Sequence, residues 1–409
     1  MKKKKIHYHS DCQFFAGCEN MLVNFFTSNE LTNKFDLTFS FRDTQEYKEG
    51  FYNRVKPNFK CFALGLPYIG SYGFIQKLEN FLLGKLIVKL IRIITNIPFT
   101  IYDVYLLKKI FSKINPDIIH INSGGYPPTM SAKSAVIAAK LSGIKKKILV
   151  VNNLAENYNS ISRILDYPMD KYICKHVNYF ITASKAAKNK LKEVLSLDDK
   201  KIFNIYNGIK LRDHSESFNE TRNRLNLNYS EGAVFGIVAL LIPRKGHKIL
   251  INAINEIQKR KVKNFIVLIE GKGPLREELE KELKIRGLTK FCKFVGVENN
   301  VINFISALDY LILPSIKNED FPNVILEAMA LGKIVIASNL SGISEQITDK
   351  ETGFLFKIGD YKKLAEIMIN LMNRKYDTLK MKNNSKKRYK TSFTNTISVK
   401  NYIKLYEQC

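Results

Sequence analysis

The sequence lacks the cysteine spacing of a zinc site. Its six cysteines are spread along 409 residues, and none forms a Cys-x-x-Cys pair or has a histidine cluster beside it. Structural zinc sites and redox motifs are usually recognised by cysteines paired at short spacing. Unpaired, scattered cysteines are typical of a reducing compartment, where disulfides are rare. We therefore expect no metal centre and a cytoplasmic location.

The beginning of the chain also lacks the features of a secretory signal. Lys2–Lys5 are followed by a short segment with polar residues, whereas a signal peptide would continue with an apolar core of about 7–15 residues. We expect this basic run to lead into the first strand.

Acidic residues are few compared with basic ones. The chain has 65 Lys and Arg against 38 Asp and Glu, which gives a formal net charge of +27. Such a charge attracts anionic partners, namely nucleotides, nucleic acids or an acidic membrane face. No Gly-x-Gly-x-x-Gly motif follows the first strand, which argues against a dinucleotide-dependent oxidoreductase. No recognised nucleic-acid-binding motif accompanies the basic residues, so we expect no nucleic acid partner.

The length suits two domains of about 200 residues each. Short apolar runs alternate with amphipathic segments, which predicts two α/β domains with doubly wound parallel sheets. Strands are predicted at Phe35–Phe41, Asp117–Ile121, Lys147–Val151, Tyr179–Thr182, Ile202–Tyr206, Ala233–Leu240, Phe265–Glu270, Lys293–Val295, Tyr310–Leu313 and Ile334–Ala337. Helices are predicted at Pro128–Leu141, Ser184–Leu195, His247–Lys261, Pro274–Arg286 and Phe393–Cys409.

The predicted domains cover residues 1–208 and 209–390, and a C-terminal helix over 391–409 is expected to pack back on the first domain. Two such domains place a central cleft between them. Ligands of open parallel sheets bind at the carboxyl ends of the strands, so we expect the site residues there.

The segment Pro314–Ala330 carries the strongest functional signal. It reads as a strand end, a loop and then a helix in whose first turn Pro322 fits well. The start of a helix suits a phosphate. Glu319 lies just before this start and Glu327 about one turn inside it, where each would repel a phosphate and accept hydrogen bonds from hydroxyl groups. A phosphate site with hydroxyl acceptors on both sides describes a nucleotide-sugar.

The spacing of Glu319 and Glu327, with Phe321-Pro322-Asn323 between them and Ala328-Met329-Ala330 after them, resembles the E-x7-E signature of family 4 glycosyltransferases with the GT-B fold. This resemblance implies a transferase of the hexosyltransferase class. It implies that Glu319 binds hydroxyls of the transferred sugar and takes part in catalysis, and that Glu327 binds the nucleotide ribose. The segment from Phe321 to Val324 would supply backbone donors, with Pro322, which has no N–H, shaping the turn between Phe321 and Asn323.

A second motif follows the strand predicted at Ala233–Leu240. Lys245-Gly246 matches the end of the family pattern G-R-L-x-x-x-K-G. The resemblance implies that Lys245 neutralises the leaving diphosphate. The chain departs from the pattern at Leu240, where the family usually has an arginine, and at Ala239, where it has glycine. Arg244 is the residue that would replace the lost charge; otherwise donor binding is altered.

Three further glycines and one valine resemble donor-binding positions of the family. Gly271 and Gly273 follow a strand as the nucleotide-binding loop does, and Val295 lies in the segment beside the base. Gly17, in Phe14–Glu19, resembles the family's Gly-Gly-x-Glu loop, with Ala16 in place of the first glycine. For Gly17 a plain tight turn remains an alternative.

His120 matches a frequent histidine of the family in the sequence Pro-Asp-Ile-Ile-His, at the end of a predicted strand. The resemblance implies that a neutral imidazole bonds the sugar or positions the acceptor. A structural role is the alternative, since a lone histidine at a strand end is more often structural.

The resemblance also implies front-face transfer with retention of configuration. No Asp-x-Asp motif occurs, so we expect no metal and no cofactor, with Lys245 acting in the metal's place. The nucleotide-sugar itself is a substrate.

The family does not explain the segment Ile75–Lys113. Lys85, Lys89 and Arg92 interrupt a strongly apolar run at helical spacing, too often for a transmembrane span. The pattern fits a helix lying on an anionic membrane surface, and it equally fits a core helix with a basic edge.

Together these features predict a retaining glycosyltransferase of bacterial surface polysaccharide synthesis. It would transfer a sugar from a nucleotide diphosphate donor to a glycan or lipid-linked acceptor, peripherally at the inner face of the cytoplasmic membrane. The alternatives are a nucleotide-binding relative without activity and, less in keeping with the motifs, a basic nucleic-acid-binding protein. The sequence does not specify base, sugar, acceptor, linkage or oligomeric state.

Overall fold

The computed structural model describes residues 3–10, 12, 15, 17–67, 82–227 and 232–409, with some side chains of residues 82–93 left undescribed. The chain divides into two compact units, each treated by itself below. Unit 1 comprises Met1–Ala183, Ala187–Ile205 and Val399–Cys409, and unit 2 comprises Ser184–Ala186 and Tyr206–Ser398.

Unit 1 is built on a seven-stranded parallel sheet with the strand order β3-β2-β1-β4-β5-β6-β7. Its strands are β1 (Lys4–Ser10), β2 (Phe35–Arg42), β3 (Lys60–Leu64), β4 (Ile118–Ser123), β5 (Lys146–Val151), β6 (Tyr179–Thr182) and β7 (Ile202–Asn204). The helices are η1 (Gly17–Glu19), α1 (Asn20–Phe26), α2 (Asn29–Lys34), α3 (Gln45–Tyr52), α5 (Leu82–Ile114), α6 (Met130–Leu141), α7 (Ile161–Leu165), α8 (Tyr167–His176), α9 (Lys185–Leu195), η3 (Asp199–Lys201) and α18 (Asn395–Gln408).

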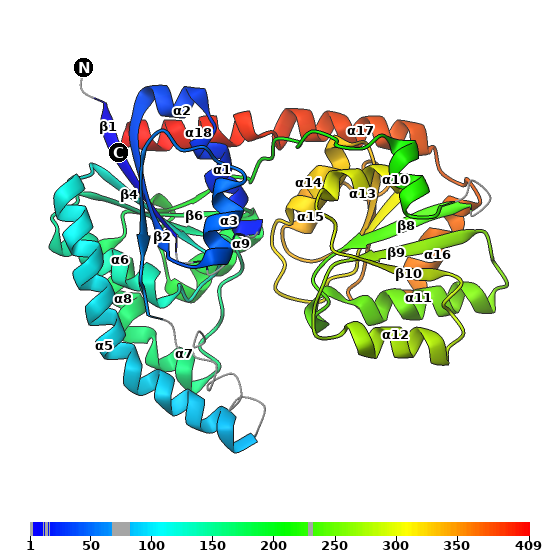
Figure 1. Cartoon of the computed structure of the whole chain (residues 1–409), viewed down its shortest axis with the longest axis horizontal. Coiled ribbons are helices and arrows are strands. Elements are labelled where there is room, and N and C mark those ends of the chain that lie inside the picture. Colours follow the sequence, from blue (N-terminus) through cyan, green and yellow to red (C-terminus); the bar gives the residue numbers. More distant parts are fainter. Residues whose placement is uncertain (1–2, 11, 13–14, 16, 68–81, 228–231) are drawn as a thin grey trace. The chain divides into compact units, whose positions relative to one another are not determined.

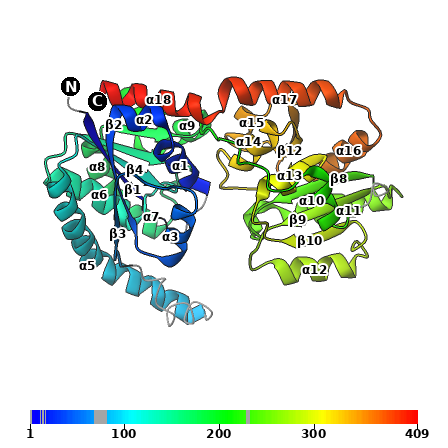
Figure 2. The same cartoon turned by 45° about the horizontal axis from the view of Figure 1, so that its top comes forward.

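Two apolar cores cover the two faces of this sheet. One unites β1 and β2 with aromatic residues of α1, α3 and α18, and the other unites β4 and β5 with α5, α6, α8 and α9. The end of α18 lies beside α2 (Figures 1 and 2), where Lys34 forms an ion pair of 2.8 Å with Glu407. The C-terminal helix therefore contributes to the core of the first sheet.

Unit 2 is built on a six-stranded parallel sheet with the order β10-β9-β8-β11-β12-β13. Its strands are β8 (Ala233–Val238), β9 (Phe265–Glu270), β10 (Cys292–Gly296), β11 (Tyr310–Leu313), β12 (Ile334–Ser338) and β13 (Gly353–Phe356). The helices are α10 (Phe218–Arg224), η5 (Pro243–Lys245), α11 (His247–Lys259), α12 (Arg276–Ile285), α13 (Val301–Ala307), α14 (Asn323–Ala330), α15 (Ile343–Gln346), α16 (Tyr361–Met372) and α17 (Thr378–Ser392).

The central strands of unit 2 are mainly apolar because helices cover both of their faces. All six residues of β9 are buried, as expected for a strand in the middle of a doubly wound sheet. Figure 1 shows α11 and α12 on one side of the sheet and α13, α14 and α17 on the other. The predicted α/β architecture, with two Rossmann-like parallel sheets, is thus confirmed.

Most predicted elements form within one or two residues of their expected ends. Strands Tyr179–Thr182, Phe265–Glu270 and Tyr310–Leu313 have the predicted bounds. The expected end of a strand at His120–Ile121 is wrong, because β4 continues to Ser123. Pro322 lies one position before its expected place and caps α14, which begins at Asn323.

The segment 75–113, for which the sequence predicts either a membrane-surface helix or a core helix, contains all of α5 but its last residue. α5 runs for 33 residues with Pro98 inside it. Residues 75–81 and the side chains of Lys85, Lys89 and Arg92, which carried the predicted basic stripe, lie outside what the structure describes. Within the described chain, none of the helices combines the length and the apolar run that a membrane crossing needs.

Candidate functional site

In unit 2, two of the predicted donor residues, Lys245 and Arg244, meet at the carboxylate of Glu319. Lys245, from η5 after β8, contacts Oε2 of Glu319, which lies in the loop after β11. Arg244 Nη1 lies 3.6 Å from the same oxygen, and Ser315 Oγ donates a hydrogen bond of 3.0 Å to it. The carboxyl ends of two adjacent parallel strands thus bring together residues that are 74 positions apart in the chain.

The ion pair of Lys245 and Glu319 is largely shielded from water. Their side chains are only 13% and 11% exposed. Burial lowers the pKa of Lys245, and the charge of Glu319 acts against this effect. A cation held in place and partly dehydrated interacts more strongly with developing negative charge than a solvated one. Lys245 is therefore a partly dehydrated cation held in place after the carboxyl end of β8.

The loop after Glu319 is anchored by an aromatic side chain. Phe321 is 5% exposed, and its ring stacks on Tyr206 at a centroid distance of 5.2 Å. Pro322 then caps α14, and the backbone amides of Asn323 and Val324 lie in the first turn of this helix. Amides in a first turn have no acceptor within the helix. Phe321 and Pro322 thus fix the chain where the first-turn backbone amides of α14 begin.

Glu327 lies one turn into α14, as predicted, and its side chain is 13% exposed. Arg212 Nη2 lies 3.6 Å from its Oε1. No motif singles out Arg212, which belongs to a polar stretch of the sequence. Arg212 lies beside Glu327 and is an additional residue of this part of unit 2.

Gly271 and Gly273, in the loop after β9, allow backbone segments to pass close to one another. A Cβ at Gly271 would collide with the carbonyl of Ala239, and one at Gly273 would lie 2.5 Å from the carbonyl oxygen of Leu241. The amide of Leu241 bonds the carbonyl of Lys272 at 2.9 Å, which fixes the two loops together. Gly271 and Gly273 therefore shape the loop that contains Leu240, whose own side chain is 45% exposed.

Two buried carboxyl groups near this loop escaped the sequence analysis. Burial raises the pKa of Glu270, the last residue of β9, to about 7, and Oε1 of Glu270 accepts a hydrogen bond of 3.1 Å from the amide of Glu298. Burial likewise raises the pKa of Asp320 to about 7. Burial of this degree depends on the tertiary structure, so no local pattern could indicate it. Val295 lies on the neighbouring strand β10 and is half-buried.

In unit 1, the loop after β1 carries Gly17 at the start of η1, followed by the buried carboxylate of Glu19. Tyr47 Oη, Ser10 Oγ and Asn122 Nδ2 donate hydrogen bonds of 2.6, 2.8 and 3.0 Å to Glu19. Gly17 is exposed, and a Cβ there would meet nothing within 4 Å. Packing therefore does not require a glycine at this position, and its predicted contact with a diphosphate remains a prediction.

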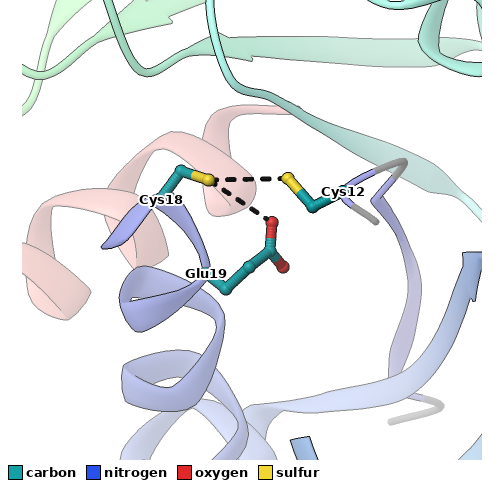
Figure 3. Close-up of side chains that lie close together, drawn as sticks. All are labelled: Cys12, Cys18 and Glu19. Carbon is teal, nitrogen blue, oxygen red and sulfur yellow. Dashed lines mark hydrogen bonds between the residues drawn. The ribbon is translucent and has the colours of Figure 1, made fainter. Parts of the chain in front are cut away.

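Two cysteines lie beside Glu19 (Figure 3). Cys12 Sγ and Cys18 Sγ are 3.5 Å apart, and Cys18 Sγ is 3.7 Å from Oε1 of Glu19. These three ligand atoms lie within 4.8 Å of one another, close enough to surround a metal ion. However, Oε1 already accepts hydrogen bonds from Ser10 and Asn122, so the donor set serves a hydrogen-bond network.

His120 does not lie at a strand end. Its ring is 1% exposed in the interior of β4, and Nδ1 lies 2.7 Å from Tyr406 Oη. Burial lowers its pKa to about 3, so the imidazole is neutral. The residue at the carboxyl end of β4 that reaches the loop is Asn122, through its hydrogen bond to Glu19. A catalytic role of His120 is still only a prediction from the resemblance.

Two family descriptions match consecutive parts of the chain. Glycosyltransferase Family 4 matches residues 76–213, and Glycosyl transferases group 1 matches residues 218–388. The second match contains Lys245, Glu319 and Glu327.

The chain belongs to glycosyltransferase family 4. It is accordingly a glycosyltransferase with the GT-B fold.

Characterised and uncharacterised glycosyltransferases resemble it in sequence. An uncharacterized glycosyltransferase of Methanocaldococcus jannaschii is 28% identical over 77% of this chain and 82% of its own length. The UDP-Gal:alpha-D-GlcNAc-diphosphoundecaprenol alpha-1,3-galactosyltransferase of Escherichia coli is 26% identical over 68% of this chain and 72% of its own. Among solved structures, Anabaena Alr3699/HepE in complex with UDP superposes with a TM-score of 0.76 at 18% identity, covering 98% of this chain and all (100%) of that one.

Proposed function

We propose that this family 4 glycosyltransferase transfers a sugar, with retention of configuration, from a nucleotide diphosphate donor to a lipid-linked glycan in bacterial surface polysaccharide synthesis. UDP is the first donor nucleotide to test, because a structural relative binds it. A lipid-linked acceptor is suggested by the acceptor of the related Escherichia coli enzyme. The observation that carries the proposal is the contact of Lys245 with Glu319 just before α14, the helix that carries Glu327.

The residues would divide the work as follows. Glu319 accepts hydrogen bonds from hydroxyls of the sugar, Glu327 accepts those of the ribose, and the first-turn amides of α14 hold the diphosphate. Lys245 and Arg244 oppose the negative charge that grows on the diphosphate as the bond between the sugar and phosphate oxygen breaks. Arg244 thereby supplies the positive charge that Leu240 does not.

Transfer proceeds through an oxocarbenium-like state, as glycoside hydrolysis does. The acceptor oxygen forms its bond to the anomeric carbon on the same face from which the diphosphate leaves. The departing phosphate oxygen takes the acceptor's proton. We expect no divalent metal requirement, because Lys245 and Arg244 supply the positive charge.

The test is a transfer assay with UDP-sugars and a polyprenyl-diphosphate-linked monosaccharide, in the presence of a chelator. The expected product carries the donor's anomeric configuration, and the chelator leaves the rate unchanged. An inverted product would overturn retention, and loss of activity with the chelator would overturn metal independence. Peripheral membrane contact is also part of the proposal.

A further inference from the structure

The outer face of α5 carries an apolar stripe. Ile94, Ile97, Ile101 and Tyr105 are 72%, 70%, 65% and 62% exposed. Their spacing of three, four and four residues places them on one face of the helix. The opposite face packs into unit 1 through Leu107 and Phe111, which are fully buried. The exposed stripe is therefore a second apolar face on a helix that already has a buried one.

The charge pattern along this face is that of a helix lying at an interface. The one charged residue between positions 93 and 107 is Asp103, which is buried. Beyond the apolar stretch, Lys108, Lys109 and Lys113 are exposed. An apolar face with tyrosines and flanking lysines is typical of helices that lie in a membrane surface.

A second helix of unit 1 exposes the same kind of surface. In α7, Ile161, Ile164 and Leu165 are 73%, 55% and 62% exposed. The helix α8 follows it, and exposes Lys171 and Lys175. α6 packs against both α5 and α8, and Figure 1 shows α5 and α7 toward the same end of unit 1.

Exposed apolar side chains of the described chain are concentrated in α5 and in the segment from α7 to the first residue of α8. Of eighteen large hydrophobic residues that are exposed there, six lie in α5 and four lie between positions 161 and 167. Monomeric soluble proteins rarely expose contiguous apolar surface on this scale without a binding function.

We propose that the exposed faces of α5 and α7 dock unit 1 on an anionic lipid bilayer. The surrounding lysines and the net charge of +27 complement anionic headgroups, whereas a second copy of this chain would bring like charges together. The inference rests on the proposed function, because the bilayer is the surface on which a lipid-linked acceptor is presented.

The test is flotation of the full-length protein with vesicles of phosphatidylglycerol and phosphatidylcholine, compared with phosphatidylcholine alone. The test variants are Ile97→Ser with Ile101→Ser in α5, and Ile161→Ser with Ile164→Ser in α7. Matched controls are Ile285→Ser and Leu379→Ser, which replace side chains that are 75% and 70% exposed in unit 2. UDP binding and sedimentation are measured on the same samples.

The wild type is expected to float with the anionic vesicles, and each double variant to lose at least about tenfold in partition coefficient, because two apolar side chains no longer enter the bilayer. The controls should float like the wild type, and all proteins should bind UDP equally. Equal flotation of test and control variants, or dispersal of a wild-type oligomer by the α5 or α7 changes, would overturn the docking surface. Failure of the wild type to bind UDP would instead count against the proposed function.

Discussion

At the scale of single residues, the contact of Lys245 with Glu319 defines the candidate donor site. Two cations, Lys245 and Arg244, share one carboxylate oxygen in a partly dehydrated setting. A buried ion pair of this kind contributes little net stability, because desolvation offsets the attraction. The ion pair is better explained by donor binding, because an incoming diphosphate would compete with Glu319 for both cations.

Replacing Lys245 by methionine tests this assignment. Lys245→Met should lower kcat by about 100-fold or more, because a preorganised cation contributes several kcal/mol at a developing charge. Lys248→Met is the matched control, since Lys248 lies three residues further on and pairs with Glu278 on the surface. A Lys245→Met enzyme with full activity would contradict the role of this residue.

The two glutamates should separate in a binding experiment. Glu327→Gln should weaken both UDP and UDP-sugar, because a hydrogen bond from a ribose hydroxyl to a charged acceptor is worth about 1.5–3 kcal/mol. Glu319→Gln should weaken the UDP-sugar without weakening UDP, because UDP has no sugar for Glu319 to bind. Titration calorimetry with both ligands measures the difference. Equal losses for UDP in the two variants would contradict the division between sugar and ribose.

At the scale of elements, the sequence predicts what depends on local pattern and turn chemistry. The apolar runs of β6, β9 and β11 were predicted with their bounds because each is a short buried strand between polar turns. The end of β4 was not predicted, because the strand continues through two polar residues, Asn122 and Ser123. Asn122 takes part in the hydrogen-bond network around Glu19. The partners of Glu327 and Glu19 come from distant segments and could not be predicted from spacing.

The same distinction applies to the glycines. The sequence placed Gly271 and Gly273 in a loop, but only the structure gives the reason for Gly273, namely the nearby backbone of Leu241. Gly273→Ala should lower the free energy of unfolding by about 1–3 kcal/mol, because the added methyl forces the two loops apart. Gly124→Ala is the control, since nothing lies within 4 Å of a Cβ there. Chemical denaturation measures both, and equal stability of the two variants would contradict this packing.

At the scale of the whole molecule, buried carboxyl groups make stability depend on pH. The pKa of Glu270 rises from 4.5 to about 7 on folding. The folded state therefore holds a proton that the unfolded state has released between these pH values. This contribution to stability is fully present below pH 4.5 and is lost as the pH rises through 7.

Glu270→Gln should remove this dependence. At pH 8 the variant should be more stable than the wild type by about 1–3 kcal/mol, and the gain should shrink toward pH 5. Calorimetric unfolding at the two pH values measures it. As a control, Glu277→Gln on the exposed face of α12 should change the free energy of unfolding by the same small amount at pH 8 and at pH 5. A gain for Glu270→Gln that does not vary with pH would contradict the assigned titration.

The central claim is that unit 2 binds a nucleotide diphosphate sugar through Lys245, Glu319 and Glu327. The most direct test is thermal unfolding of the wild type with UDP-, GDP- and ADP-sugars, repeated with Lys245→Met. A ligand at about one hundred times its Kd stabilises the folded protein by about 2.7 kcal/mol, so one nucleotide series should raise the midpoint of the wild type clearly and that of the variant much less. No shift with any of the three series, or an equal shift in the variant, would contradict the claim.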